Sequence, residues 1–313
     1  MSGKKVLVTG GHGNLGSYIT KELAQSGYDV YVLTRNSKNK IDDIDYKIIE
    51  ADITDLESLH QKLDFEIDYC VHTASFNEFF LPEYPKKALD INTLGTRNLL
   101  EVLSKKNIKN FIYFSTFHVY GLNSGIITEE NYLNPKNDYA STHLFAEFYV
   151  KQFGYTNNLK YTILRLTNSY GVPTFIDSDK WYLVLNDLVK MAFENQKVVL
   201  HSNGKAKRDF IYMGDVAIIV DKLLRIDATN DIFNVSSSQI YEIIELANIV
   251  KNVFKVRYKK TIEIQINQHD KLIYETLEVK NEKLKSLIDF TINDVIQQEI
   301  NKIFDLLEQN SEK

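Results

Sequence analysis

Residues 8–16 read VTGGHGNLG, and this short stretch decides the expected fold. It places Gly10, Gly13 and Gly16 in a G-x-x-G-x-x-G spacing between a β-branched run and an amphipathic run. Glycines at such a turn allow close backbone approach to a pyrophosphate, and the helix N-terminus that follows attracts its negative charge. A glycine triplet alone is weak evidence and also fits a purely structural turn. Its position at the first strand–helix junction nevertheless predicts a dinucleotide-binding site.

Outward from this turn, strand-like and helix-like runs alternate through the first half of the chain. Several of the apolar runs are nearly continuous, as expected when helices cover both faces of a parallel sheet. The runs that predict strands are 4–10, 29–34, 46–50, 68–72, 110–115 and 160–165, and those that predict helices are 14–27, 85–107 and 138–154. This alternation predicts an α/β fold with a doubly wound parallel sheet of the Rossmann type.

Beyond about residue 172 the pattern is less regular, which indicates a smaller α+β cap that would bind the substrate. A strand and a helix follow at 208–224 and a further strand at 231–237, so the two parts interleave along the chain. Within the cap we expect the segment 177–187 and His201 to line the pocket. The expected domains are a dinucleotide-binding domain at 1–173 plus 208–235 and a substrate-binding cap at 174–207 plus 236–313.

Composition narrows the class of protein. The 313 residues carry 37 Lys and Arg against 42 Asp and Glu, a net charge of −5 that argues against a nucleic-acid partner. No apolar run approaches the roughly 20 residues of a membrane span. The opening MSGKKVLVTGG leads directly into a strand-like run, so we expect no signal peptide, and the single Cys70 leaves no internal disulfide. We therefore expect a cytoplasmic protein with no membrane partner.

The second predicted strand ends in VLTRNSK, residues 32–38. Sites that prefer NAD usually place Asp or Glu here to bind the ribose hydroxyls. This chain has Thr34, followed by Arg35 and Asn36. A guanidinium pairs well with a 2′-phosphate, so the segment favours NADP(H) over NAD(H). A solvated basic loop is the alternative interpretation.

Several further segments, taken with the glycine turn, resemble the extended short-chain dehydrogenase/reductases. More specifically, they resemble the NAD-dependent epimerase/dehydratase family, which acts on nucleotide sugars. They are similar, in order, to the family segments GDITD, HxAA, NxxGTxNLLE, SSxxVYG, RxxNxYGP and RDFxxVxDVA. The matching stretches are ADITD (51–55), VHTAS (71–75), NTLGTRNLLE (92–101), FSTFHVYG (114–121), RLTNSYGVP (165–173) and RDFIYMGDVA (208–217). The resemblance covers nearly the whole chain.

The resemblance implies roles for individual residues and a homodimer formed through helices 85–107 and 138–154. Tyr139 would move a proton and Thr116 would orient the substrate oxygen, with residue 143 as their catalytic partner. The expected substrate contacts, with a nucleotide-diphosphate sugar as substrate, are Thr116, His118, Asn168, His201 and Arg208. The expected cofactor contacts are Gly10, Gly13, Asn14, Leu15, Gly16, Thr34, Arg35, Asn36, Asp52, Ile53, Thr73, Ala74, Ser75, Asn92, Tyr139 and His143.

The stretch NDYASTHLFAE, residues 137–147, departs from the family pattern because His143 stands where lysine usually follows Tyr139. A phenol with a pKa near 10 needs a nearby positive charge to act as a base. Residue 143 lies one helical turn from Tyr139 on the same face, but an ordinary histidine is mostly neutral above pH 7. His143 is therefore a working substitute, a mark of slow or absent turnover, or a laboratory substitution. If it works when charged, the rate falls as pH rises through the histidine pKa.

A second departure concerns the type of reaction. Dehydratases of this family follow the threonine with an acidic pair, whereas this chain has Thr116, Phe117 and His118. Without that acid and base, 4,6-dehydration is disfavoured. His118 is a separate acid–base candidate or a structural hydrogen-bonding group, and the histidines lack the close spacing of metal ligands, so no metal is expected. The sequence thus predicts a nucleotide-sugar epimerase or oxidoreductase, that is, a keto-sugar reductase or dehydrogenase. The alternative is a cofactor- and sugar-nucleotide-binding protein with little or no turnover because of His143.

Overall fold

A computed structural model describes residues 3–35, 37–77, 83–177 and 180–311. Its main feature is a seven-stranded sheet in which every neighbouring pair of strands is parallel. The strand order is β11 (Asp231–Val235), β7 (Tyr161–Leu166), β5 (Asn110–Thr116), β4 (Tyr69–His72), β1 (Lys5–Thr9), β2 (Asp29–Thr34) and β3 (Lys47–Glu50). The predicted doubly wound Rossmann-type sheet is confirmed.

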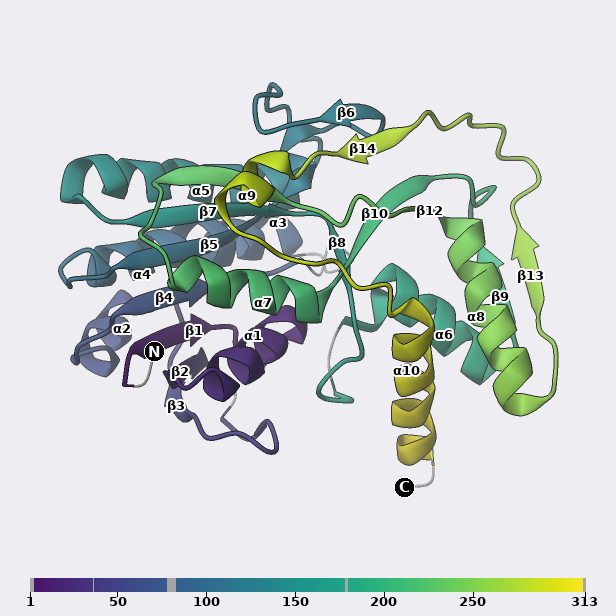
Figure 1. The fold of residues 1–313 in the computed structure, drawn as a ribbon, viewed down its shortest axis with the longest axis horizontal. Coiled ribbons are helices and arrows are strands. Elements are labelled where there is room, and N and C mark those ends of the chain that lie inside the picture. Colours follow the sequence, from purple (N-terminus) through teal and green to yellow (C-terminus); the bar gives the residue numbers. More distant parts are fainter. Residues whose placement is uncertain (1–2, 36, 78–82, 178–179, 312–313) are drawn as a thin grey trace.

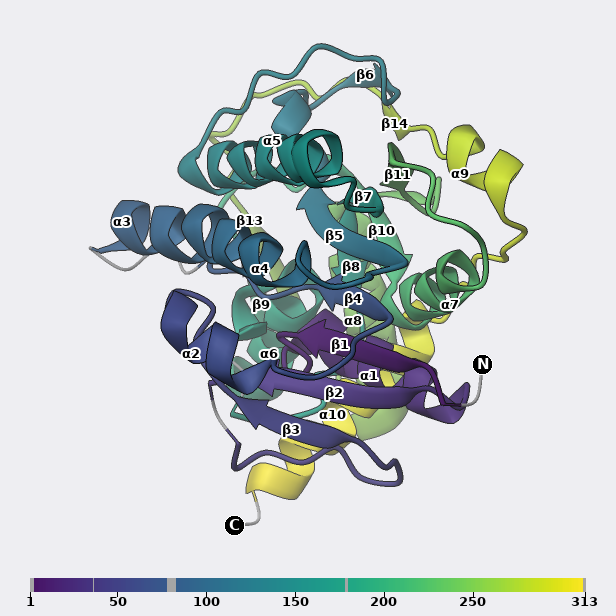
Figure 2. The same cartoon turned by 90° about the vertical axis from the view of Figure 1, so that its left-hand side faces the viewer.

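Helices cover both faces of the sheet, as Figure 2 shows. Side chains alternate between the two faces along each strand, so Val6 and Val8 pack against one helical layer while Leu7 packs against the other. The first layer contains α1 (Asn14–Gln25) and α7 (Met213–Leu224). The second layer contains α2 (Leu56–Lys62), α4 (Thr96–Leu103) and α5 (Asp138–Asn157).

The helix predicted over 85–107 is broken into three segments. They are α3 (Tyr84–Ala88), the π-helix η1 (Leu89–Gly95) and α4. A π-turn rotates the residues that follow it relative to those before it, and such turns are frequent at functional sites. Here it brings Asn92 and Thr93 to face α5, where the Asn92 amide donates to the Thr142 hydroxyl at 3.0 Å and the Thr93 hydroxyl donates to the Thr142 carbonyl at 3.0 Å.

The cap lies beyond the carboxyl ends of the strands, to the right in Figure 1. Its core is formed by α6 (Val184–Asn195), α8 (Ile243–Tyr258) and α10 (Ile296–Ser311). Two small sheets accompany these helices. One contains β12 (Ile240–Glu242), β10 (Lys207–Tyr212) and β8 (Asn168–Tyr170), and the other contains β9 (Lys197–Leu200) and β13 (Glu263–Ile266), which lie against α6 and α8 within the cap.

The chain returns from the cap to the main sheet before its last helix. β14 (Leu277–Val279) pairs in parallel with β6 (Gly125–Ile127), and α9 (Glu282–Leu287) contributes Leu284 to the core on the α1 and α7 side. This part of the expected cap therefore packs against the expected dinucleotide-binding domain, and the domain boundaries remain a prediction. Among the described residues, no helix is long and apolar enough to cross a bilayer.

Candidate functional site

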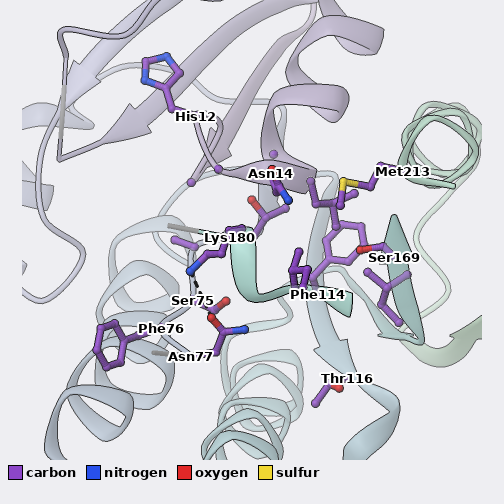
Figure 3. Close-up of a pocket in the computed structure, with 18 of the residues that line it drawn as sticks. His12, Asn14, Ser75, Phe76, Asn77, Phe114, Thr116, Ser169, Lys180 and Met213 are labelled. Atoms are coloured by element: carbon purple, nitrogen blue, oxygen red, sulfur yellow. Dashed lines mark hydrogen bonds between the residues drawn. The ribbon is translucent and has the colours of Figure 1, made fainter. Parts of the chain in front are cut away.

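A cavity of about 680 Å³ lies where the carboxyl ends of the central strands meet the cap. Its wall combines the turn after β1, the loop after β4, the end of β5, the start of α5 and the cap residues around 180–186. In parallel α/β sheets, ligands bind at the carboxyl ends of the strands, where the loops diverge. Figure 3 shows side chains from these separate segments around one space.

The turn after β1 is shaped to receive a ligand at the N-terminus of α1. Gly10 has a φ of 68°, and a Cβ atom at Gly16 would lie 2.1 Å from the Gly10 carbonyl oxygen, so only glycine fits. The Asn14 side chain lines the cavity, and neither its amide nitrogen nor its oxygen has a hydrogen-bond partner among the described residues. Because buried polar groups are normally paired, this cradle fits an anionic ligand such as a pyrophosphate.

The end of β2 carries the residues predicted to select the cofactor. Thr34 and Arg35 line the cavity, whereas Asn36 lies outside the described residues. The Arg35 guanidinium is exposed and forms no ion pair within the described part of the chain. Asp52 and Ile53 line the same end, and the Asp52 carboxylate accepts hydrogen bonds from the backbone and hydroxyl of Thr54, both at 2.8 Å.

The loop after β4 brings Thr73, Ala74 and Ser75 to the cavity wall. The sequence predicted these three residues to contact the cofactor. Asn92 does not line the cavity and is buried behind this loop. Its amide oxygen accepts from the Phe76 backbone N–H at 2.7 Å, and its amide nitrogen donates to the Phe76 carbonyl at 3.0 Å. Asn92 therefore holds the loop in place and makes no direct contact with the space that a ligand would occupy.

Thr116, Tyr139 and His143 meet at one end of the cavity. Thr116 is the last residue of β5, and Tyr139 lies in the first turn of α5, which is capped by the Asn137 side chain accepting from the Ala140 N–H at 2.8 Å. Burial raises the pKa of Tyr139 to about 12, and a hydrogen bond with Thr116 opposes the rise. The phenol is therefore protonated at neutral pH.

His143 is 3% exposed, and its ring centroid lies 4.6 Å from that of Tyr139. Burial lowers the pKa of His143 to about 3, nearby His118 also lowers it, and the Phe114 backbone opposes the shift. The imidazole is therefore neutral throughout the physiological range. The expectation that a charged His143 lowers the Tyr139 pKa does not agree with this pKa, and among the described residues no acid is paired with the ring.

The predicted substrate residues divide into two groups. Asn168 and His118 line the cavity, and burial with nearby Arg208 lowers the pKa of His118 to about 4. Arg208 lies beside His118 but does not itself line the cavity, and it has no carboxylate partner among the described residues. His201 is exposed and lies outside the cavity wall, so the structure does not bring it to the other candidates.

Three polar side chains that no sequence motif indicated form a hydrogen-bonded cluster between the loop after β4 and the cap. Lys180 Nζ donates to the Asn77 amide oxygen at 3.2 Å, and the Tyr182 hydroxyl donates to the same oxygen. In Figure 3 Lys180 reaches toward Ser75 and Asn77. Lys180 and Tyr182 fall within the segment 177–187 that was expected to line the pocket, whereas Asn77 carried no local sequence signal. No cluster of three or more His, Cys, Asp or Glu side chains suited to a metal ion occurs in the described residues.

A parallel sheet with a glycine-rich first turn, and a cavity between the carboxyl ends of its strands and a cap, defines a Rossmann-type α/β protein. Residues 6–236 match the model of the NAD dependent epimerase/dehydratase family. The chain belongs to this family, and the resemblance seen in its motifs is confirmed.

Known proteins similar to this chain include both reaction types of the family. A putative UDP-glucose 4-epimerase of Methanocaldococcus jannaschii is 32% identical over 254 residues, covering 79% of this chain and 81% of that protein. A dTDP-D-glucose 4,6-dehydratase of Dictyostelium discoideum is 27% identical over 281 residues, covering 80% of this chain and 62% of that protein. The structure of a UDP-glucose 4-epimerase of Thermotoga maritima with UDP-glucose superposes with a TM-score of 0.82 at 23% identity, covering 98% of this chain and 99% of that one.

Proposed function

We propose that the protein is a nucleotide-sugar epimerase or keto-sugar oxidoreductase that uses a nicotinamide dinucleotide. The observation that carries the proposal is the Thr116–Tyr139 pair in a cavity that also includes the unpaired Asn14 amide and the glycine cradle. One cavity thus combines a pyrophosphate cradle with a proton-transfer group. A UDP-sugar is the proposed substrate, in keeping with the similarity to UDP-glucose 4-epimerases.

The proposed chemistry follows from the state of Tyr139. When bound, the nicotinamide would supply the acceptor and donor of a hydride. Tyr139 gives its hydroxyl proton to the oxygen of a keto sugar as that carbon is reduced, and takes the proton back as the carbon is oxidised. Thr116 donates a hydrogen bond that orients this oxygen. Because the Tyr139 pKa is about 12, the protonated form dominates at neutral pH and the reduction step is favoured.

Arg208 suits the diphosphate of such a substrate. Burial lowers the pKa of Arg208, and its Nη1 donates only to the adjacent Lys207 carbonyl at 2.8 Å. A partly buried guanidinium without a carboxylate partner among the described residues is a strong anion-binding group. Its position beside His118, which lines the cavity, supports this role.

A 4,6-dehydratase is a weaker proposal for this chain despite its dehydratase relatives. The residues after Thr116 are Phe117, which is buried in an apolar cluster, and His118, which burial keeps neutral. Elimination of water needs an acid and a base on the sugar, and no carboxylate follows Thr116 to supply them.

For the cofactor we propose binding of NADP(H) in preference to NAD(H). The support is the exposed Arg35 on the cavity wall, which has no ion pair among the described residues, and the lack of Asp or Glu in the sequence at the end of β2. The family description favours NAD instead.

Calorimetry with both dinucleotides checks the proposal. Arg35→Ala is expected to lower the affinity for NADP(H) about tenfold, by roughly 1.4 kcal/mol, and to leave the affinity for NAD(H) unchanged. Tighter NAD(H) binding by the unmodified protein would reject it.

A UDP-sugar deuterated at the epimerised carbon tests the main proposal. Hydride transfer through a bound cofactor keeps the label in the product, and Tyr139→Phe is expected to lower turnover by roughly 10²–10⁴-fold with dinucleotide binding retained. Dinucleotide binding without turnover on any sugar nucleotide would instead favour the alternative of a binding protein. The observation behind that alternative is the neutral His143 beside a phenol whose pKa is about 12.

We also propose a homodimer formed through η1 and α5. These neighbouring helices expose four large apolar side chains, Leu89 (44%), Leu94 (48%), Phe145 (46%) and Phe148 (53%). Exposed apolar side chains on two packed helices suit a self-complementary interface.

The proposal predicts that light scattering detects a dimer and that Phe148→Glu converts it to a monomer. The control variant Val256→Glu, at an exposed position on α8, should remain dimeric. A monomeric unmodified protein at micromolar concentration would contradict it.

A further inference from the structure

One ring nitrogen of His143 has no hydrogen-bond partner. The Nε2 atom is buried and unpaired among the described residues, although His143 lines the cavity. Leaving a buried N–H or ring nitrogen unpaired is unfavourable, so such an atom in a residue that lines a cavity indicates that a ligand group pairs with it. On the other side of the ring, Nδ1 lies 2.8 Å from the Tyr113 hydroxyl oxygen.

Tyr113 determines which nitrogen of His143 carries the proton. It lies on β5, is 2% exposed, and faces the α5 layer. Burial, followed by the nearby Glu147, raises the pKa of Tyr113, so its hydroxyl stays protonated and needs an acceptor. Nδ1 of His143 is the partner of that hydroxyl among the described residues. If Nδ1 accepts, the ring proton is on Nε2, the buried atom that has no partner among the described residues.

Glu147 does not accept a hydrogen bond from the Tyr113 hydroxyl. Its Oε1 accepts from the Ser115 hydroxyl at 2.6 Å and from Arg165 Nε at 2.9 Å, and its Oε2 accepts from Arg165 Nη2 at 2.7 Å. A carboxylate already paired with a guanidinium in bidentate geometry is largely satisfied. The Tyr113 hydroxyl is therefore left to His143.

The groups that face His143 keep it neutral. They are Tyr113 from β5, Tyr139 from its own helix, His118 from the turn after β5 and His72 from β4. His72 is itself held between the hydroxyls of Thr9 and Thr96, at 2.5 Å and 2.9 Å. None of these groups is a carboxylate, and the Phe114 backbone, which favours the charged ring, is outweighed by burial, so among the described residues the ring acts as an uncharged donor.

We propose that Tyr113 is a positioning residue that holds His143 in the Nε2–H tautomer, so that a neutral ring with its proton on Nε2 stands at the wall of the cavity in which the dinucleotide would bind. The inference rests on the proposed dinucleotide site and goes beyond it, because it assigns a second residue and a protonation state. It follows that dinucleotide binding does not depend on titration of His143 between pH 5 and 9.

The tautomer of His143 can be measured by NMR in the ligand-free protein. Long-range ¹H–¹⁵N correlation spectra of histidine-labelled protein distinguish Nε2–H from Nδ1–H, and the His143 signal is assigned with His143→Gln. We expect Nε2–H in the unmodified protein, unchanged from pH 5 to 9. In Tyr113→Phe we expect a tautomer mixture and dinucleotide affinity lowered about 5- to 10-fold, the loss of one hydrogen bond.

Two further variants separate positioning from general loss of structure. Tyr120→Phe removes a buried, hydrogen-bonded phenol hydroxyl that does not line the cavity, and dinucleotide affinity should stay within about twofold of the unmodified protein. His143→Gln keeps a neutral N–H near the position of Nε2, so its affinity should exceed that of His143→Leu. This comparison holds even if Tyr113→Phe fails to fold.

The outcomes distinguish this inference from the function on which it rests. If the unmodified protein binds neither dinucleotide, the proposed function fails and the inference fails with it. If the protein binds a dinucleotide but His143 carries Nδ1–H, or if His143→Gln and His143→Leu bind equally, only the role of Tyr113 and His143 is overturned.

Discussion

At the scale of single residues, the chemistry of the site depends on how burial changes ordinary side chains. Tyr139 occupies the position that its motif predicts, but burial raises its pKa to about 12 and no cation lowers it. His143 lies on the same helical face, as its spacing predicts, yet burial lowers its pKa to about 3. The residue types were evident from the sequence, whereas their protonation states depend on strands and helices distant along the chain.

His143→Lys is expected to increase the rate of alcohol oxidation at pH 8 by about tenfold or more. A lysine ammonium beside Tyr139 would favour the phenolate and lower its pKa by on the order of 1–3 units, which increases the fraction of base at pH 8. Initial rates from pH 6 to 10 check this. The unmodified protein should show oxidation rates that rise with pH toward 12 and no histidine inflection.

His143→Gln is the matched control for this prediction because it replaces one neutral side chain with another. Its pH profile should follow that of the unmodified protein. An inflection near pH 6.5 in the unmodified protein alone would show that His143 titrates in the working enzyme and would contradict the neutral ring.

At the scale of elements, side chains from separate segments hold the helices in the places where the site needs them. The π-turn in η1 points Asn92 at the loop after β4, and the side chain fixes that loop through Phe76. A periodic apolar pattern predicts one continuous helix here, because a single extra residue in a turn leaves almost no trace in the periodicity. Below the site, α5 is tied to β7 by the ion pair of Glu147 with Arg165, whose side chains are 0% and 2% exposed.

Glu147→Gln is expected to lower the free energy of unfolding by about 3–5 kcal/mol, because it leaves the Arg165 charge buried without a counter-charge. Glu101→Gln, which breaks the exposed pair with Arg97 on α4, should cost less than about 1 kcal/mol. Urea unfolding followed by circular dichroism measures both. Equal losses in the two variants would mean that the buried pair does not hold α5 on the sheet.

At the scale of the whole molecule, the cavity lies between the cap and the sheet, and three histidines near it make the free energy of unfolding depend on pH. His72 and His143 are buried and His118 is half-buried near the site, and desolvation lowers their pKa values to about 3, 3 and 4 respectively. The neutral rings are stable only while the folded state excludes the proton. An unfolded chain, with histidine pKa values near 6.5, binds these protons readily.

The free energy of unfolding is therefore expected to decrease below about pH 6.5. The folded pKa values are lower than the unfolded ones, so the unfolded state binds more protons and stability is lost as pH falls from about 6.5 toward 3, by up to ~1.4 kcal/mol per pH unit per histidine. Melting temperatures from pH 8 to 4 check this. His143→Gln should reduce the slope, whereas His269→Gln, at an exposed position, should not. Identical slopes for the two variants would contradict the prediction.

The sequence alone determined the features that are local in the chain: the glycine turn at Gly10 and Gly16, the parallel strands with their covering helices, and the placement of Thr116 and Tyr139. Each depends on neighbouring residues or on a regular period, and both are written directly in the sequence. Only the tertiary structure decided the neutral state of His143, its pairing with Tyr113, and the position of His201 outside the cavity. Burial and hydrogen-bond partners depend on segments far apart in sequence, so no local pattern could reveal them.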